Sequence, residues 1–416
     1  MNATPLLAAL AILATTTFGQ DDDRAFLEQF GKTFEQGGSV PAKDFVPEGE
    51  MHGALHTVRP MADNDGLNNT YYVDTPAGVE AIVGTRALKE RIHEVYAIDY
   101  LRGLSKTEEF KKALTKSLGD KVASAGEIVR NPINTLKNVP KGASRFFGRI
   151  GEGMKGGKSE EESGGVLAGI TGVDQAKAKL AVKLGVNPYS TNEELQRELT
   201  ATAKATAGGG LIVNAAASVA SGGAGAALTV VGVNQTLHDT LVNSTPEDLR
   251  IINRKKLFAL GLTRAQADEF LMHPWYSPWG ETIITDALAG IGAAPAAFLA
   301  RACQALTEED ADYFQRLAQI LARYHAGEAP LSAIRVENGV VCAVDQNGTL
   351  VIPLSCDYAT WAERAARRAE EFTASVHRDG KIKGLKLWVD GTVSARLAKE
   401  LSAREITLKT EVLGHP

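Results

Sequence analysis

The 34 residues from Ala205 to His238 contain no Asp, Glu, Lys or Arg, and this run limits what the chain can fold into. Its central part, residues 211–233, would be long enough to cross a bilayer as one helix at about 1.5 Å per residue. Polar residues lower its hydrophobicity, however, and Gly222-Gly223 favours a turn between two shorter helices. Small residues allow such helices to approach closely. We therefore expect a buried, Gly/Ala-rich helical hairpin over 205–238, with conditional or permanent membrane insertion as alternatives.

The composition is that of a globular protein. Of the 416 residues, 44% are apolar and 23% charged, which argues against a wholly disordered chain, a collagen-like repeat or a polytopic membrane protein. The net charge of −5 gives no general reason to expect nucleic-acid binding. Ten of the 41 glycines fall between Gly142 and Gly172, where we expect a flexible linker. Seven fall between Gly208 and Gly232, where we expect closely packed or membrane-inserting helices.

The N-terminus is typical of an export signal. Residues 1–19 carry no charged side chain, and Leu6 to Ala14 form an apolar core too short to span a bilayer. Small residues precede a plausible cleavage site before Gln20, although the segment lacks Lys and Arg. We expect residues 1–19 to be a signal peptide and the mature protein to be periplasmic or secreted, with a frayed helix of a cytosolic protein as the alternative.

The pattern of the remaining chain predicts an α+β multidomain protein. Residues 20–118 form an N-terminal α+β region, with strands between 53 and 84 and a helix capped by Thr85. Residues 119–165 form a basic linker that contains Gly and Pro. Residues 166–330 form a mainly helical domain, in which a capping box from Thr191 to Glu194 and caps at Thr263 and Thr307 mark helix starts.

The last part of the chain, residues 331–416, has a different pattern. Two apolar segments flank the turn Asp345-Gln346-Asn347-Gly348, and they are followed by a helix, a strand, a second helix and a final strand. The order β-β-α-β-α-β predicts a two-layer α+β domain.

The charge distribution predicts a surface that binds anionic lipid. From Lys106 to Lys158 there are twelve Lys and Arg against five Asp and Glu, although the whole protein is acidic. Basic and apolar side chains alternate within this segment, which could lie on an anionic membrane surface. The candidate residues are Arg130, Lys137, Lys141, Arg145, Phe146, Phe147 and Arg149. A solvated linker with a few anchoring hydrophobic residues is the alternative.

A second candidate binding site is the aromatic cluster around Trp275, Tyr276 and Trp279. Two prolines stiffen this segment of an aromatic-poor chain. The rings could stack on a sugar or lie at a lipid headgroup interface. A helix-to-helix corner packed against the core is the alternative, and we prefer it.

No complete catalytic or cofactor motif is present. The tract from Gly151 to Ser159 fails the spacing of a phosphate-binding loop, and neither a Gly-x-Ser-x-Gly nor a His-Glu-x-x-His string occurs. Asp63, Asp65 and Asn68 resemble the start of a calcium loop but favour a hairpin turn. No cofactor or metal is therefore expected; the pair His52 and His56 is a weak metal candidate.

The three cysteines, Cys303, Cys342 and Cys356, are too few for a disulfide scaffold. Cys342 and Cys356 are the nearest in sequence and could form one bridge, but they lie at unequal distances from the predicted turn. Three buried thiols are the alternative.

These observations favour an exported, non-enzymatic protein of a bacterial-type envelope that binds at a membrane surface or to another envelope component. One alternative is an exported hydrolase whose residues meet only in the fold, with Asp63, Asp65, His56 and His93 as its acid and base groups. The other is a pore-forming protein that inserts the glycine-rich hairpin. The sequence does not predict an oligomeric state.

Overall fold

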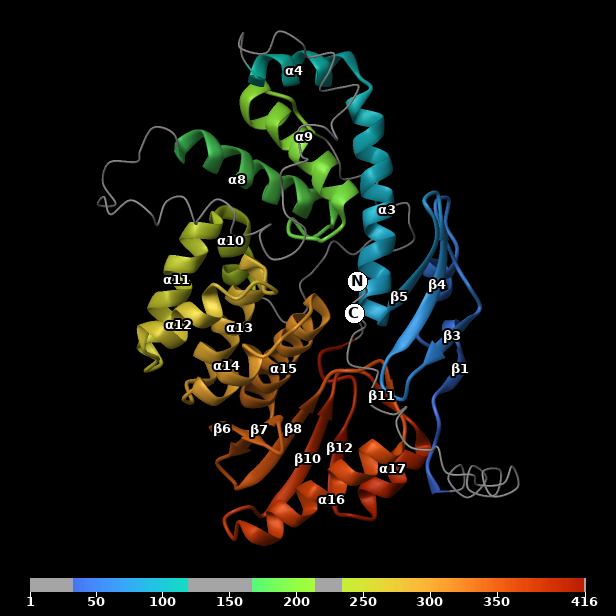
Figure 1. Ribbon diagram of the computed structural model, residues 1–416, viewed down its shortest axis with the longest axis vertical. Coiled ribbons are helices and arrows are strands. Elements are labelled where there is room, and N and C mark those ends of the chain that lie inside the picture. The colour runs from blue at the N-terminus through green and yellow to red at the C-terminus, as the bar shows by residue number, and fades with distance from the viewer. Residues whose placement is uncertain (1–32, 119–166, 214–233, 415–416) are drawn as a thin grey trace, which may run out of the picture.

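The structure is a computed structural model that describes residues 33–118, 167–213 and 234–414. It is a mixed helix and sheet structure with several sheets (Figure 1). The predicted signal peptide, the basic linker with its seven candidate membrane-binding residues, and most of the predicted hairpin lie outside the described residues.

The N-terminal sheet is antiparallel. Its strands are β1 (Gly38–Pro41), β2 (Thr57–Val58), β3 (Met61–Asn64), β4 (Asn69–Thr75) and β5 (Gly78–Val83), in the order β1-β3-β4-β2 with β5 also paired to β4. Two short helical segments, η1 (Ala42–Asp44) and α2 (Glu48–Met51), lie between β1 and β2. Alternate residues of β4, Tyr71 and Val73, are buried and pack in the same cluster as Leu88 of the following helix.

The turn between β3 and β4 contains the Asn- and Asp-rich segment. One carboxylate oxygen of Asp65 accepts hydrogen bonds from the backbone amides of Leu67 at 2.8 Å and Asn68 at 2.7 Å. The segment is thus a hairpin turn, as its composition predicts. In the described part of the chain, no three His, Cys, Asp or Glu residues converge to hold a metal ion.

Helix α3 (Thr85–Ser105) is the long element that links this sheet to the helices α4 (Glu108–Leu118), α8 (Leu167–Leu184) and α9 (Glu193–Gly209) (Figure 1). The predicted cap at Thr85 is wrong, because Gly84 is the N-cap and Thr85 donates its backbone amide to Asp357. The predicted cap at Thr191 is also wrong, since Asn192 caps α9 by accepting from the amides of Glu194 and Leu195.

A second group of helices follows residue 234. It comprises α10 (Gln235–Asn243), α11 (Pro246–Ala259), α12 (Arg264–Leu271), α13 (Pro278–Ile291), α14 (Ala296–Ala302) and α15 (Glu308–Gly327). Thr263 and Thr307 cap α12 and α15, as the sequence predicts. Ser277 caps α13 by accepting from the Gly280 amide, which places the aromatic segment at a helix N-terminus.

The C-terminal sheet has the order β12-β10-β8-β7-β6. Its strands are β6 (Leu331–Glu337), β7 (Val340–Asp345), β8 (Thr349–Leu354), β10 (Gly384–Val389) and β12 (Ile406–Lys409). The pairs β8/β10 and β10/β12 are parallel, and α16 (Glu363–Arg378) and α17 (Ala395–Ser402) connect them. The short strands β9 (Tyr358–Ala359) and β11 (Thr392–Val393) form a separate pair. The predicted order is present, with β6 as an additional strand before it and β9 and β11 as additional short strands within it.

Both faces of this sheet are covered. On β7, Val341 and Ala343 belong to the core cluster that includes α15, whereas Cys342 and Val344 belong to the cluster that includes α16 and α17. This alternation is the two-residue period of a strand buried on both sides. Cys303, Cys342 and Cys356 are all free thiols, so the bridge considered for Cys342 and Cys356 is not formed.

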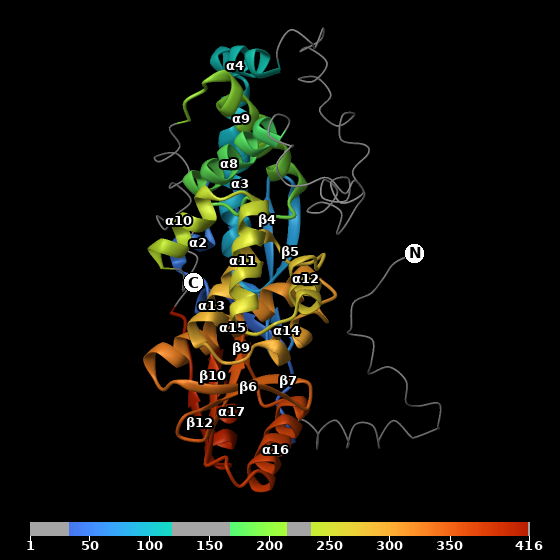
Figure 2. The ribbon, with the colours of Figure 1, turned by 90° about the vertical axis from the view of Figure 1, so that its left-hand side faces the viewer.

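The molecule is elongated, with α4 at one end and α16 at the other (Figure 2). None of the described helices is both long enough and apolar enough to span a bilayer.

Candidate functional site

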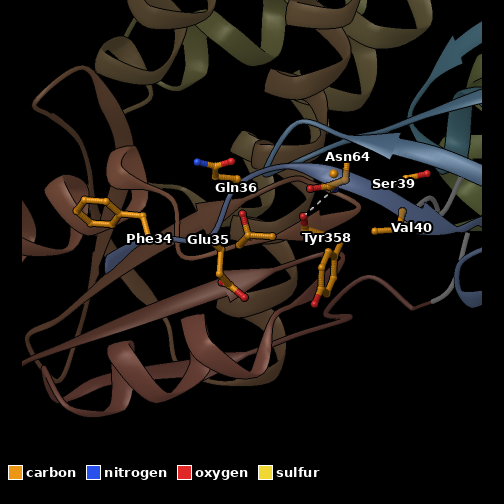
Figure 3. A pocket seen from close by; sticks show the side chains of 9 residues that line it. Phe34, Glu35, Gln36, Ser39, Val40, Asn64 and Tyr358 are labelled. Atoms are coloured by element: carbon orange, nitrogen blue, oxygen red, sulfur yellow. Dashed lines mark hydrogen bonds between the residues drawn. The ribbon is translucent and has the colours of Figure 1, made fainter. Parts of the chain in front are cut away.

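Two cavities lie where different parts of the chain meet. One is an open hollow of about 470 Å³ between β1 and the segment that follows β8 (Figure 3). The other is a cleft of about 420 Å³ between α3 on one side and α13 and α15 on the other. They differ in whether their polar side chains already have partners.

The hollow is part of a contact between the two ends of the described chain. Phe34 lies at one end of it and Ser39 and Val40 at the other (Figure 3). Glu35 accepts hydrogen bonds from the backbone amide of Trp361 and the hydroxyl of Ser394, both at 2.5 Å. The polar groups that hold this wall together are therefore bonded to protein.

We call the contact between residues 64–69 and residues 355–361 the seam. The two carboxylate oxygens of Asp357 accept from the amides of Asn69 at 2.8 Å and Thr85 at 2.9 Å. Gly84 is the N-cap residue of α3, and Asp357 supplies the carboxylate that accepts from the first amide of the helix. Asn64 donates to the carbonyl of Tyr358 at 3.2 Å and to Asn69 Oδ1 at 2.8 Å (Figure 3). The seam joins the N-terminal end of α3 to the segment that follows β8.

Four segments line the cleft: the end of β5 and the first half of α3, the loop 187–192, residues 275–283 at the start of α13, and the first two turns of α15. The lining is rich in hydrogen-bonding groups. Its polar side chains are Arg86, Glu90, Arg91, Glu94, Asn187, Ser190, Thr191, Asn192, Ser277, Glu308, Glu309, Asp312 and Gln315.

The wall formed by α3 and the loop is held by paired charges. Glu94 accepts from Asn192 Nδ2 at 2.8 Å and Arg91 Nη1 at 3.1 Å, and it is also bonded to Ser190. Arg91 binds Glu80 through two nitrogens, at 2.6 and 2.9 Å. These contacts fasten the loop to α3, so Arg91 and Glu94 shape the cleft but have few free hydrogen-bonding groups.

The opposite wall carries carboxyls on α15. Glu308 and Asp312 are four residues apart and face the cleft together. Burial raises the pKa of Glu308 to about 7, opposed by a hydrogen bond from Thr191 and reinforced by neighbouring carboxylates. The Asp312 carboxyl opens onto the cleft, yet the enclosing protein raises its pKa while Arg86 lowers it.

Gln315 lies one turn further along α15. Its side chain is 6% exposed and lines the cleft, where a Cβ on Gly280 would come within 3.2 Å of its Oε1. No hydrogen bond joins its amide to any described residue. The largely buried side chain therefore presents an unpartnered amide, with donors and an acceptor, to a molecule that enters the cleft.

The aromatic cluster divides between the core and the cleft. Tyr276 is 1% exposed and donates to the Ala302 carbonyl at 2.9 Å, while Trp279 donates to the Leu241 carbonyl at 3.1 Å. Trp275 is half-buried, and its indole N–H has no partner among the described residues. All three residues line the cleft, so the segment is a packed helix-to-helix corner with one open polar group on the cavity.

The four residues predicted for a hydrolase site have separate local partners. His56 is bonded to Tyr96 and to the Glu50 carbonyl, and His93 to the Lys89 carbonyl. Asp63 accepts from Tyr72, and Asp65 forms the turn described above. Within the described residues no hydrogen bond joins any two of the four, and neither cavity is lined by them. A hydrolase site on these residues stays a prediction.

The residues that sequence analysis missed are Arg86, Glu308, Asp312 and Gln315. The acidic residues at the start of α15 were visible in the sequence, but acidic residues are common in the first turn of any helix and do not by themselves indicate a site. Comparison with family models, with curated proteins and with solved structures gives no match.

Proposed function

We propose that the protein is an exported, non-enzymatic envelope protein, periplasmic or secreted, that binds a small polar molecule in the cleft between α3, α13 and α15. The observation that carries the proposal is Gln315, whose side chain is 6% exposed and whose amide has no hydrogen-bond partner among the described residues, on the wall of a cavity of about 420 Å³. A cavity of this size, with a few convergent polar groups and apolar walls, has the character of a small-molecule site.

Two further features support a binding site. The indole N–H of Trp275 is open, as is the carboxyl of Asp312, which accepts no hydrogen bond from the described residues. The scaffold around them is firm, since Arg91 and Glu94 fasten the loop 187–192 to α3. When the walls of a site are already ordered, less conformational entropy is lost on binding.

A steric block tests this proposal. Ala87 is exposed on the cleft wall, so Ala87→Trp should fill the cavity without removing a hydrogen-bonding group. Ala81→Trp is the matched control, because Ala81 is exposed on β5 and does not line the cleft. Ligand-observed NMR with three probe sets, neutral sugars, amines and dicarboxylates, should detect binding to the natural chain and to Ala81→Trp but not to Ala87→Trp. Binding by none of the probes, or equal binding by both variants, would contradict the proposal.

A second candidate function is binding to an anionic membrane surface, favoured by the excess of basic residues between Lys106 and Lys158. Its test is flotation of the mature protein with anionic vesicles, before and after Lys137, Lys141, Arg145 and Arg149 are changed to Glu. The natural chain should float and the variant should not. Equal flotation of both would show that these basic residues do not mediate membrane binding.

We also propose the finer architecture as domains: an N-terminal α+β region to residue 118, a helical domain over 166–330 and a C-terminal α+β domain over 331–416. The change from helices to strands at Leu331 supports the last boundary. The packing of α15 on β7 and β8 means that the two units share a core cluster.

A further inference from the structure

The cleft has more acidic than basic side chains. Five carboxyl residues line it, Glu90, Glu94, Glu308, Glu309 and Asp312, against two arginines. Both arginines already have carboxylate partners on or beside α3: Arg86 Nε lies 2.9 Å from Glu90 Oε1, and Arg91 binds Glu80 and Glu94. The excess of negative charge therefore lies on the α15 wall.

On that wall, Glu308, Glu309 and Asp312 lie near the open groups of the site. Thr191 donates to Glu308, whereas Asp312 accepts no hydrogen bond from the described residues. Gln315, one turn along, offers an amide oxygen as a further acceptor. The available groups are thus mainly acceptors and negative charges, which suit a ligand that brings donors and positive charge.

The neighbouring wall is aromatic. Trp275 is half-buried at the cleft, and the ring of Trp279, which also lines it, meets that of Tyr189 edge to face at 5.9 Å between centroids. An indole face attracts ammonium groups through its quadrupole as well as through apolar contact. A carboxylate wall beside a tryptophan is the combination that recognises an organic cation.

We propose that the cleft binds an organic cation with ammonium groups, such as a short polyamine, held by Asp312, Glu308 and Gln315 and packed against Trp275. This inference rests on the proposed function, that the cleft is a ligand site. An anionic ligand would meet the carboxyls of Glu308, Glu309 and Asp312. A metal ion is less suited, since no three metal-ligating side chains converge anywhere in the described residues.

Binding of a cation should be linked to proton release. Glu308 and Asp312 face Glu90 and Arg86 on α3, Glu309 and Arg316 on their own helix, and Thr191 on the loop; Arg316 is in turn bound by Asp390 after β10 at 2.9 Å. In the free protein the pKa of Glu308 is raised to about 7. A bound cation favours the ionised carboxylates and lowers these pKa values. Affinity should therefore rise with pH from about 5 to about 8 and then level off.

The test is calorimetric titration with spermidine, with maltose and succinate as neutral and anionic probes. Spermidine alone should bind, and at a pH near the Glu308 pKa it should release protons, seen as a heat that depends on the buffer. Asp312→Asn and Glu308→Gln should each weaken binding about tenfold or more and flatten the pH dependence. Glu363→Gln is the control, an exposed carboxyl at the start of α16.

The outcomes separate this inference from the proposed function. If maltose or succinate binds in a manner that Ala87→Trp blocks, the cleft is a ligand site but not one for organic cations. If spermidine binds equally to the natural chain, Asp312→Asn and Glu308→Gln, the carboxyls do not hold it and the inference is wrong. If no probe binds, both fail. Circular dichroism of each variant shows whether a loss of binding reflects a loss of fold.

Discussion

The seam and the cleft both contain acidic side chains between distant parts of the chain, but these side chains differ in how many hydrogen bonds they accept from the protein. In the seam, burial raises the pKa of Asp357, while the amides of Asn69 and Thr85 oppose the shift. In the cleft, burial raises the pKa of Glu308, and Asp312 accepts no hydrogen bond from the described residues. A raised pKa therefore occurs in both places and does not by itself distinguish a structural acid from a binding one.

Hydrogen-bond satisfaction makes the distinction. Asp390, close to the seam, follows the same rule as Asp357: it accepts from Arg316 at 2.9 Å, Ser355 at 3.0 Å and the Cys356 amide at 3.1 Å. Across the cleft, Gln315 and the indole of Trp275 have no protein partner among the described residues. These open groups lie together on one cavity, where a ligand could form hydrogen bonds with them.

The largest effect expected from this comparison is on stability. Asp357→Ala leaves the amides of Asn69 and Thr85 unpaired at the N-terminus of α3 and should lower the free energy of unfolding by about 3 kcal/mol. Denaturant titration measures the loss. Asp74→Ala is the control, because Asp74 is half-exposed and pairs with the equally exposed Arg59; it should cost less than about 0.5 kcal/mol.

Binding measurements complete this prediction. Under conditions in which Asp357→Ala remains folded, its affinity for a cleft ligand should be within a factor of about two of the natural chain, because Asp357 does not line the cleft. A stable Asp357→Ala variant would show that the seam is not held by this carboxylate. A folded variant with lost binding would show that the seam and the cleft are coupled.

Local patterns predicted the elements whose causes are local. The stripe of Leu88, Ile92 and Leu101 forms the buried face of α3, and Thr263 and Thr307 cap the helices that they precede. Of the two misplaced caps, the one at α9 is local, since Asn192 next to Thr191 takes that role, whereas the one at α3 is not. At α3 the capping acceptor is Asp357, which lies 272 residues away from Thr85, and no short sequence window contains that information.

The candidate site was only partly predictable for the same reason. The aromatic segment around Trp275 was visible because Trp and Pro are unusual in this chain. Glu308 and Asp312 look like ordinary acidic residues in the first turns of a helix, and their raised pKa values arise from burial and from neighbours such as Glu90 on α3. A cleft between segments more than a hundred residues apart depends on tertiary packing, which periodicity does not encode.

The smallest effect on stability is expected when the same Gln→Leu change is made at a cleft residue and at a control residue. This pair also gives the sharpest test of the comparison. Gln315→Leu removes an amide that has no described partner and opens onto the cleft, so the free energy of unfolding should change by less than about 0.5 kcal/mol, while binding of a cleft ligand weakens. Gln175→Leu is the control: Gln175 does not line the cleft and donates to the Asn243 carbonyl at 3.1 Å, so its loss should cost about 1 kcal/mol without affecting binding. Denaturant titration and calorimetry on both variants measure the pair. Equal destabilisation by the two substitutions would mean that Gln315 has a structural partner, and the distinction between seam and cleft would then fail at the residue on which it most depends.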